Sequence, residues 1–512
     1  NSCNPQPSPP GPISGGTFGL GCAYIDPNPI DKVNGQGHNY FLSHNPYAFN
    51  SWAGFGEVYY QIAPEIKLTA GARYTDDKKH FPVFPSQALM LGKGVPQSCV
   101  AEDPACVDGV VDQEWRKWTG RAVVNWTPKL DFTDQTMVYA SLARGYKGGG
   151  ANPPGVVGVS FQGFSIASPS DLTHPLTFKP EYNNALELGT KNTALDGSVV
   201  FDADVFYYKY KNYQISQIVD RTAVNFNFNA TVMGAEVQST WSPLPGLKLG
   251  FNGGYENATF DKDQYAIDLM DRTAGHPGWM TVKPFITQTS NCVLPTYVVD
   301  EMMRVGDHQP GSGAIGPITT GCLYGYGLGI DPVTQDLYYA NPNPSLLPGY
   351  PGYDPNVGGL DFFGNPDPEN GQNIYNGVQY LPPNRGQGFT KNIGGNQLPN
   401  APHYTVSVNA DYTMPLSDSW AGTLHGDFYW QSQSYWRIFN DMGYDKLRGY
   451  SNVNLALILT NSDGWQVMGY MKNIFNSTAI TGAFLTSDDT GLTTNVLVTD
   501  PRLYGTLITK NF

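Results

Sequence analysis

Residues 404–414 read YTVSVNADYTM, and this stretch decides the fold. Its even positions, from Tyr404 to Met414, are apolar or aromatic, whereas its odd positions, from Thr405 to Thr413, are polar. A period of two predicts a β-strand with two unlike faces. Strands of soluble proteins are usually about five or six residues long, but a tilted strand that crosses a bilayer needs about 9–11. The stretch therefore predicts a membrane-spanning strand.

The same alternation recurs along the chain and, with the turn residues between, predicts thirteen strands. They cover residues 52–62, 66–78, 118–127, 136–147, 182–193, 198–215, 230–241, 247–260, 403–414, 420–436, 450–460, 465–476 and 502–512. Short connections alternate with long ones, which include 79–117, 148–181, 261–402 and 477–501. Short turns on one rim and long loops on the other are typical of an outer-membrane barrel. The predicted fold is all-β, a transmembrane antiparallel β-barrel with long extracellular loops; a soluble sandwich or propeller is the alternative.

Bulk composition is compatible with this fold without deciding it. The chain has 512 residues and contains no run of 18 apolar residues, so no transmembrane helix is predicted. A hydrophobic content of 40% suits a barrel in which alternate residues face lipid. The 32 Tyr, 25 Phe and 10 Trp suit interfacial girdles, and equally a soluble β-protein. A net charge of −14 argues against nucleic acid as a partner.

The two ends of the chain add a prediction about completeness. The last strand ends at Phe512; if Phe512 faces lipid, so do Tyr504, Thr506 and Ile508, with Lys510 near enough to the rim to snorkel. Bacterial single-chain barrels have an even strand number, and lipid does not tolerate an open sheet edge. Thirteen strands therefore predict a missing strand and a longer polypeptide, unless the strand count is wrong by one.

The six cysteines predict disulfides. All lie in the initial segment or in long loops, and none in a strand. An even number outside a cell indicates disulfides, and six cysteines allow fifteen pairings. Local pairing suggests Cys3–Cys22, Cys99–Cys106 and Cys292–Cys322. Close CxxC spacing with histidine partners, which a zinc site needs, is absent.

Seven stretches follow one another in a recognisable order. They are AGFGEV at 53–58, LTAGARYT at 68–75, YASLARGYKGGG at 139–150, the segment 180–192, LPNAP at 398–402, KNIFN at 472–476 and PRLYG at 501–505. Together they resemble the strands of TonB-dependent outer-membrane receptors. The resemblance covers most of residues 50–512. It implies a 22-stranded barrel in the bacterial outer membrane, of which this chain would supply about thirteen strands.

The resemblance also implies an amino-terminal plug domain and a TonB box, and this sequence contains neither. We expect residues 1–51 to be an extracellular loop segment and 52–512 the carboxyl-terminal part of the barrel, with 261–402 as a long loop insertion. The implied partners are the TonB complex, a small bulky ligand such as a siderophore, and outer-membrane lipid with lipopolysaccharide.

Strand phase identifies polar residues that face the lumen, where they would contact a plug or line a ligand path. They are Arg73, Arg121, Glu187, Lys191, Asp202, Asp204, Glu236, Lys248, His425 and Asp427. The alternative is simple cross-strand pairing of wet charges, each pair contributing about 0.2–1 kcal/mol.

The aromatic residues of the long loop are the predicted ligand contacts, because loops on a rigid scaffold carry specificity. They are Tyr324, Tyr326, Tyr338, Tyr339, Tyr350, Tyr353, Tyr375 and Tyr380. Their rings could stack on sugars or aromatic siderophores, or on one another. The acidic run of Asp261, Asp263, Asp268 and Asp271 could hold a hard cation but lacks EF-hand spacing.

No nucleophile elbow, Walker A motif or HExxH motif is present, so we predict no catalytic, cofactor or metal site and no enzyme. The predicted function is energy-coupled uptake of a scarce ligand, most simply a ferric siderophore by family resemblance. A passive porin and a structural or adhesive surface protein remain the alternatives.

Overall fold

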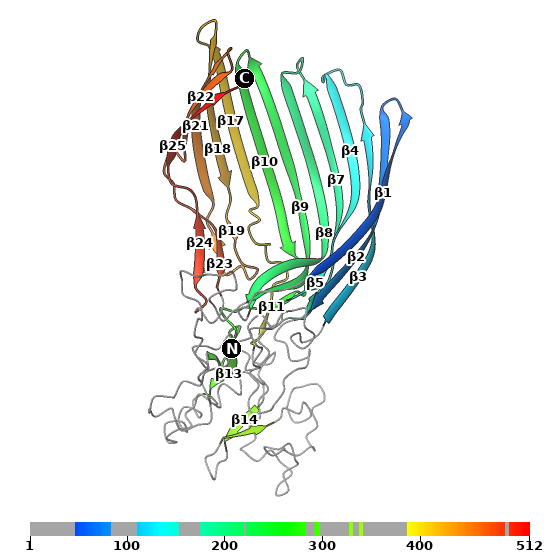
Figure 1. The fold of residues 1–512 in the computed structure, drawn as a ribbon, viewed down its shortest axis with the longest axis vertical. Coiled ribbons are helices and arrows are strands. Elements are labelled where there is room, and N and C mark those ends of the chain that lie inside the picture. The colour runs from blue at the N-terminus through cyan, green and yellow to red at the C-terminus, as the bar shows by residue number, and fades with distance from the viewer. Residues whose placement is uncertain are drawn as a thin grey trace, which may run out of the picture.

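The computed structural model describes residues 47–82, 110–152, 175–219, 222–282, 291–296, 299, 327–330, 337–340, 387–486 and 491–511. Thirteen strands form one antiparallel sheet in which each strand pairs with its neighbours in chain order (Figure 1). They are β1 (Ala48–Ala63), β2 (Ile66–Pro82), β3 (Val110–Trp126), β4 (Gln135–Lys147), β7 (Glu181–Ala194), β8 (Val199–Val219), β9 (Thr222–Leu244), β10 (Leu247–Phe260), β17 (Tyr404–Pro415), β18 (Trp420–Gln431), β21 (Tyr450–Asn461), β22 (Trp465–Lys472) and β25 (Leu503–Lys510). The predicted all-β class and the thirteen strands are confirmed. Within the described residues, β1 and β25 are not paired with each other.

The connections fall on two rims, as the alternation of loop lengths predicts. Short turns gather at the upper rim in Figure 1, and the long connections begin and end at the lower rim. The turn before β10 shows why glycine is needed there. Gly246 has a φ of +85°, and a Cβ at this position would lie 2.2 Å from the carbonyl oxygen of Thr413.

Several predicted strand bounds are wrong: β3 begins at Val110 and not at 118, and β18 ends at Gln431 and not at 436. In β8 and β9 the strand continues where the sequence looks like a loop. β8 and β9 remain paired as far as Val219 and Thr222, beyond a bulge between Tyr210 and Tyr213. Residues 225–229 read NFNFN, which places asparagines on one face of this ribbon and phenylalanines on the other. Asparagine is a frequent turn residue, so its repetition obscured the alternation.

Six two-stranded sheets lie in the connections between the thirteen strands. Most of their strands fall in segments predicted as loops, but Ser434–Tyr435 lies within the strand predicted as 420–436. The six sheets pair β5 (Gly150–Ala151) with β6 (Thr177–Phe178), β11 (Tyr265–Ile267) with β16 (Thr390–Asn392), β12 (Trp279–Val282) with β13 (Cys292–Pro295), β14 (Gly327–Ile330) with β15 (Leu337–Ala340), β19 (Ser434–Tyr435) with β20 (Lys446–Leu447), and β23 (Ile480–Leu485) with β24 (Thr494–Val498).

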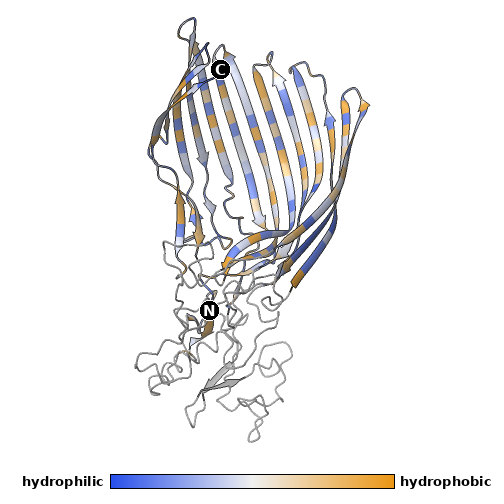
Figure 2. Ribbon diagram, in the orientation of Figure 1, coloured by the Kyte–Doolittle hydropathy of each residue, from blue (hydrophilic) through white to orange (hydrophobic). Residues whose placement is uncertain are grey.

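Hydrophobic and hydrophilic residues alternate along the strands (Figure 2). One face of the sheet, the convex face, exposes large apolar side chains such as Leu142, Leu188 and Leu457, which are 59%, 52% and 50% exposed. Exposed aromatic side chains stand at both ends of this face: Tyr255, Tyr404 and Trp430 toward the long loops, and Trp126, Trp241 and Trp465 toward the short turns. An apolar band between two aromatic girdles is the pattern of a strand wall in a bilayer.

Lys510 lies at the short-turn end of the convex face, as predicted from the terminal strand. Its ammonium group donates to the carbonyl oxygen of Asp463 and lies 5.2 Å from the centre of the Trp465 ring. The charge therefore reaches the rim, while the stem of the side chain stays with apolar neighbours. The described part of the chain has no helix long and apolar enough to cross a membrane.

The opposite, concave face carries the polar residues and, near the long loops, the buried core. Phe206, Phe228, Val232 and Phe260 of β8, β9 and β10 belong to one buried cluster with loop residues. The loop residues are Ile393, Leu398 and Ile438. Segments after β16 and after β19 thus fold over the concave face and are held there by apolar burial.

Candidate functional site

Four carboxylates from consecutive strands line one pocket of about 350 Å³ on the concave face. Glu187 comes from β7, Asp204 from β8, Glu236 from β9 and Glu256 from β10. Asp204 and Glu236 are direct cross-strand partners. Strand alternation places all four on the same face, because the residues between them point to the convex side. We call this site the acidic pocket.

Tyrosines complete the acidic pocket and hold one carboxylate in place. The Tyr139 hydroxyl donates to Glu187 Oε1 at 2.5 Å, and the Tyr208 hydroxyl donates to Glu187 Oε2 at 3.4 Å. Gly189 makes room for the first contact, since a Cβ there would lie 2.6 Å from the Tyr139 ring. The Tyr208 ring also stacks on Phe206, with ring centres 4.9 Å apart.

The loop segment 398–402, which reads LPNAP, forms the edge of the acidic pocket. Leu398, Pro399 and Ala401 line it together with Tyr210 and Tyr213. The backbone N–H of Leu398 donates to the Ala258 carbonyl at 2.9 Å, which fixes the segment to β10. The pocket therefore has a strand wall and a loop edge.

The acidic pocket is negatively charged, and no lysine or arginine of the described ranges balances its carboxylates. The nearest interior cation on β7, Lys191, pairs with Asp202 at 3.6 Å instead. No lysine or arginine of the described segments forms an ion pair with the four carboxylates. A wall of one charge sign between apolar surfaces concentrates ions of the opposite sign. The pocket is suited to bind cationic side chains or a cationic group.

Other predicted interior residues form cross-strand pairs across the concave face. Arg121 Nε donates to Glu57 Oε1 at 2.7 Å. His425 lies between two carboxylates, with Nδ1 2.7 Å from Asp411 and Nε2 3.4 Å from Asp427. These pairs fit the alternative of wall charges that satisfy one another.

Two further predicted residues lie on the same wall without an ion-pair partner in the described segments. Arg73 donates from Nε to the Thr75 hydroxyl at 3.0 Å and lies 5.7 Å from the centre of the Phe55 ring. Lys248 stands opposite Asp411 in the register of β10 and β17.

A second polar cluster joins two long loops, and of its members the sequence singled out only Asp268 and Asp271. We call it the loop junction; its members are Asp268, Asp271, Lys391, Arg437 and Asp445. Arg437 donates from Nη1 to Asp268 Oδ1 and from Nε to Asp445 Oδ1, both at 2.6 Å. Lys391 lies 3.2 Å from Asp268 Oδ2 and 2.7 Å from Asp271 Oδ2.

Two strand pairs place these residues together. The β11–β16 pair sets Lys391 beside the segment that follows Ile267, and the β19–β20 hairpin carries Arg437 and Asp445 between its strands. Asp268 is 2% exposed and Asp445 is fully buried. The Arg437 guanidinium also lies 5.3–5.4 Å from three aromatic ring centres, those of Trp436, Phe439 and Tyr444.

Burial and pairing act in opposite directions on the acids of the loop junction. Burial raises the pKa of Asp445, and the bond from Arg437 offsets only part of that rise. For Asp271, burial would raise the pKa, but hydrogen bonds from Lys391 and Thr273 outweigh it and lower the pKa. Burial likewise opposes the charged form of Lys391, yet its pairing with Asp271 and Asp268 raises its pKa.

The loop junction is expected to open in alkali. Because the pKa of Lys391 is raised on folding, its stabilising effect is complete below its unfolded pKa of about 10.4 and is lost as pH rises through the folded value. Trp436, which is 9% exposed, reports on this change. Acrylamide quenching of its fluorescence, taken as the difference from Trp436→Phe, should be constant from pH 6 to 9 and rise above about pH 10.4. An unaltered alkaline rise in Lys391→Met would assign the transition to another group.

The acidic run predicted as a possible cation site is already occupied by protein cations. Asp268 and Asp271 pair with Lys391 and Arg437, and Asp261 accepts from Lys209 at 2.7 Å. No cluster of three or more metal-ligating residues is found in the part of the chain that the structure describes.

Most of the predicted ligand-contacting tyrosines lie outside the described residues. These are Tyr324, Tyr326, Tyr350, Tyr353, Tyr375 and Tyr380. Tyr338 and Tyr339 lie in β15.

The cysteine pairings also remain a prediction. Cys3, Cys22, Cys99, Cys106 and Cys322 lie outside the described residues. Cys292 begins β13, so the expectation that no cysteine lies in a strand is wrong. Cys292 is 3% exposed and is not a free thiol.

Comparison with known proteins yields a family and a fold. The family model described as TonB dependent receptor-like, beta-barrel matches residues 10–282, more than half of the chain. No curated protein matches. Among solved structures, the ferric yersiniabactin uptake receptor FyuA from Yersinia pestis is 13% identical with a TM-score of 0.50, over 90% of this chain and 45% of that one. The siderophore receptor PiuA from Acinetobacter baumannii is 12% identical with a TM-score of 0.47, over 91% and 43%. This chain therefore spans less than half the length of either solved structure.

Proposed function

Because the chain belongs to the TonB-dependent receptor-like β-barrel family, we propose that it acts in the outer membrane as a receptor that takes up a scarce, bulky ligand. The ligand is a ferric siderophore, and the TonB complex supplies the energy. The observation that carries the proposal is the family match, which covers the strands from β1 to β12. The convex apolar band with its two aromatic girdles supports the membrane location.

The ligand class follows the Yersinia pestis receptor, which takes up ferric yersiniabactin. This part of the proposal rests on likeness and not on a contact within the chain. The tyrosines that the sequence identified are the proposed ligand contacts, because aromatic rings stack on planar or sugar-like groups. They are Tyr324, Tyr326, Tyr338, Tyr339, Tyr350, Tyr353, Tyr375 and Tyr380.

The acidic pocket is assigned to a different partner, a plug domain inside the barrel. Siderophores that bind iron through oxygen are often anionic, and an anion would be repelled by the four carboxylates. Basic side chains of a plug would instead find unpaired acceptors there. The other interior residues, Arg73, Arg121, Lys191, Asp202, Lys248, His425 and Asp427, complete the proposed contact wall.

Energy-coupled uptake is tested in the bacterium that makes the protein. Accumulation of radiolabelled iron from its siderophore should fall to background when the TonB complex is deleted, and recover when it is restored. Equal uptake without the TonB complex would instead favour a passive porin.

Electrical measurement separates the same alternatives in vitro. The complete protein in a planar bilayer should show no large steady current, because loops and plug fill the barrel. A large open-channel current would contradict the plugged receptor. Normal iron uptake after deletion of the gene itself would favour the surface-adhesive alternative.

A further inference from the structure

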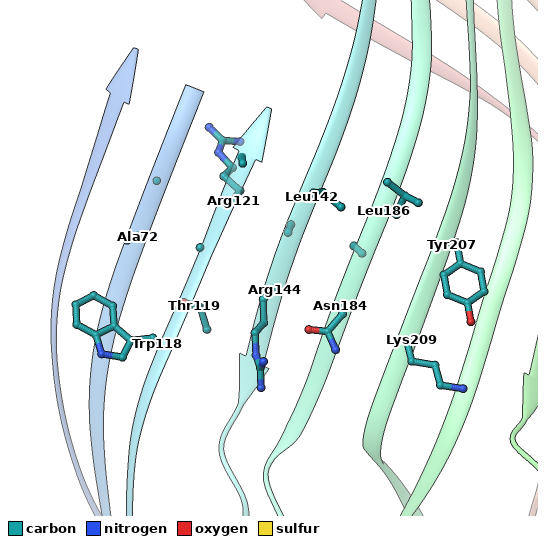
Figure 3. Close-up of a pocket in the computed structure, with 15 residues that line it drawn as sticks. Ala72, Trp118, Thr119, Arg121, Leu142, Arg144, Asn184, Leu186, Tyr207 and Lys209 are labelled. Carbon is teal, nitrogen blue, oxygen red and sulfur yellow. The ribbon is translucent and has the colours of Figure 1, made fainter. Parts of the chain in front are cut away.

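A groove of about 580 Å³ lies on the convex face, across the strands from β2 to β8. In Figure 3, Leu142 and Leu186 occupy one level of neighbouring strands, and Arg144, Asn184 and Lys209 occupy the next level toward the long loops. The register agrees, since Leu142 pairs with Leu186, and Arg144 with Asn184. An apolar stretch thus ends at a polar, cationic row.

The groove exists because two strands separate. The β3–β4 ladder ends at Gly120 and Arg144, although β3 extends to Val110 and β4 to Lys147. Its floor is formed by small residues, including Ala72, Gly120 and Ala122. Trp118 forms one side and is 66% exposed, with its ring centre 5.1 Å from that of Tyr74.

Arg144 lines the polar end of the groove, and Lys117, which does not line the groove, lies near the same tyrosine, Tyr182. Arg144 and Lys117 both lie over the Tyr182 ring, at 5.0 Å and 5.9 Å from its centre. In the described part of the chain neither has a carboxylate partner. Lys209 differs, because it donates to Asp261. Unbalanced positive charge is unusual on a chain whose net charge is −14, and here it stands beside an apolar groove.

We propose that this groove binds an anionic, phosphate-bearing lipid of the leaflet on the long-loop side. An acyl chain lies against Trp118, Leu142 and Leu186, and the phosphate accepts hydrogen bonds from Arg144. The planar guanidinium binds phosphate oxygens in a bidentate manner. The inference rests on the membrane location in the proposed function, and not on the ligand or on TonB.

A lipid fits these features better than a soluble anion or a protein partner. The groove is continuous with the exposed apolar band of the convex face, where hydrocarbon is the surrounding medium. The cations lie at the edge of this band, where headgroups meet the chains. A soluble anion would leave the apolar part of the groove empty.

Trp118 provides a direct probe, because brominated acyl chains quench a nearby indole. The complete protein is placed in phosphatidylcholine bilayers that contain a small fraction of brominated phosphatidylglycerol or, separately, of brominated phosphatidylcholine. The signal is the difference from Trp118→Phe. We expect quenching by phosphatidylglycerol to indicate a local enrichment of about tenfold or more, as a charge-assisted phosphate contact implies.

Substitutions in the groove separate the effect of charge on lipid binding from the effect of groove shape. Arg144→Gln should reduce quenching to the phosphatidylcholine level, and Arg144→Lys should retain part of the preference. Ala122→Phe fills the floor and should lower quenching with all charges intact. Arg502→Gln removes another exposed arginine at the long-loop end of the sheet and should change nothing.

Three outcomes would overturn the proposal. The first is equal quenching by the two brominated lipids in the unaltered protein. The second is a preference that survives in a folded Arg144→Gln variant or is lost equally in Arg502→Gln. The third is competition by glycerol 3-phosphate, which lacks acyl chains and would identify a soluble-anion site. Loss of iron uptake alone would bear on the proposed function and not on this site.

Discussion

Replacing Arg437 by methionine is expected to lower the stability of the loop junction by about 3–5 kcal/mol, the usual cost of removing one partner from a buried ion pair. Asp445 is fully buried and Asp268 is 2% exposed, so both carboxylates would lose their main donor without gaining water. Hydrogen exchange of the amides from Trp436 to Asp445 measures the effect. Backbone donors there, such as the Asp441 N–H that bonds Asp445 Oδ2 at 3.0 Å, should lose protection.

An exposed ion pair is the matched control. Lys78 and Glu114 lie 3.0 Å apart, with side chains 55% and 41% exposed. Lys78→Met should change stability by less than about 1 kcal/mol, because water screens such a pair. Arg437→Lys should recover little, since a lysine cannot supply both bonds and stack against the surrounding rings. Full protection of the amides in Arg437→Met would show that the apolar contacts of the two loops hold them without the ion pairs.

Leu457→Arg is expected to destabilise the inserted sheet by about 2–4 kcal/mol, although the leucine side chain is 50% exposed. On a soluble protein a substitution at such a surface position typically changes stability by about 0.5 kcal/mol or less. Leu457 lies near the middle of β21, however, between the aromatic girdles of the convex face. There the guanidinium would enter hydrocarbon, far from either rim. Equilibrium unfolding from phospholipid vesicles in guanidinium chloride measures the change.

Gln238→Arg is the paired control because it adds the same charge on the concave face. Gln238 stands opposite Asp202 in the register of β8 and β9, so the new guanidinium meets water and a carboxylate. Its stability should stay within about 1 kcal/mol of the unaltered protein. Equal, small effects of the two arginines would mean that neither face of the sheet meets lipid, and would contradict the membrane barrel itself.

The strands were predictable because their signal is local. Alternation identifies a strand such as β17 from a dozen consecutive residues, and the residues between strands mark its ends. The motif KNIFN at 472–476 is another local signal, because one of its residues ends a strand. Asn473 adopts a φ of 46° and donates from its amide to the carbonyls of Ser477 and Asp500, both at 2.8 Å, which ends β22. The asparagine at position 473 thus gives a physical reason for this sequence motif.

The loop junction could not be predicted in this way because its bonds join distant segments. Arg437 and Asp268 are separated by 169 residues, and no period or spacing relates them. The acidic run at 261–271 was visible, but its cationic partners were not, so the sequence left binding of a hard cation open. The sign of charge can be read from a sequence, whereas the group that neutralises it depends on tertiary packing.

The strictly sequential ladder from β1 to β25 has a consequence for how such a wall is built. Every strand finds its partner next to it along the polypeptide, so the sheet can zip up one hairpin at a time. No segment has to thread past another. At each step the free edge presents unpaired N–H and C=O groups to the strand that follows. The sheet therefore stops growing only when its free edge pairs with a strand that leaves no backbone N–H or C=O group unpaired.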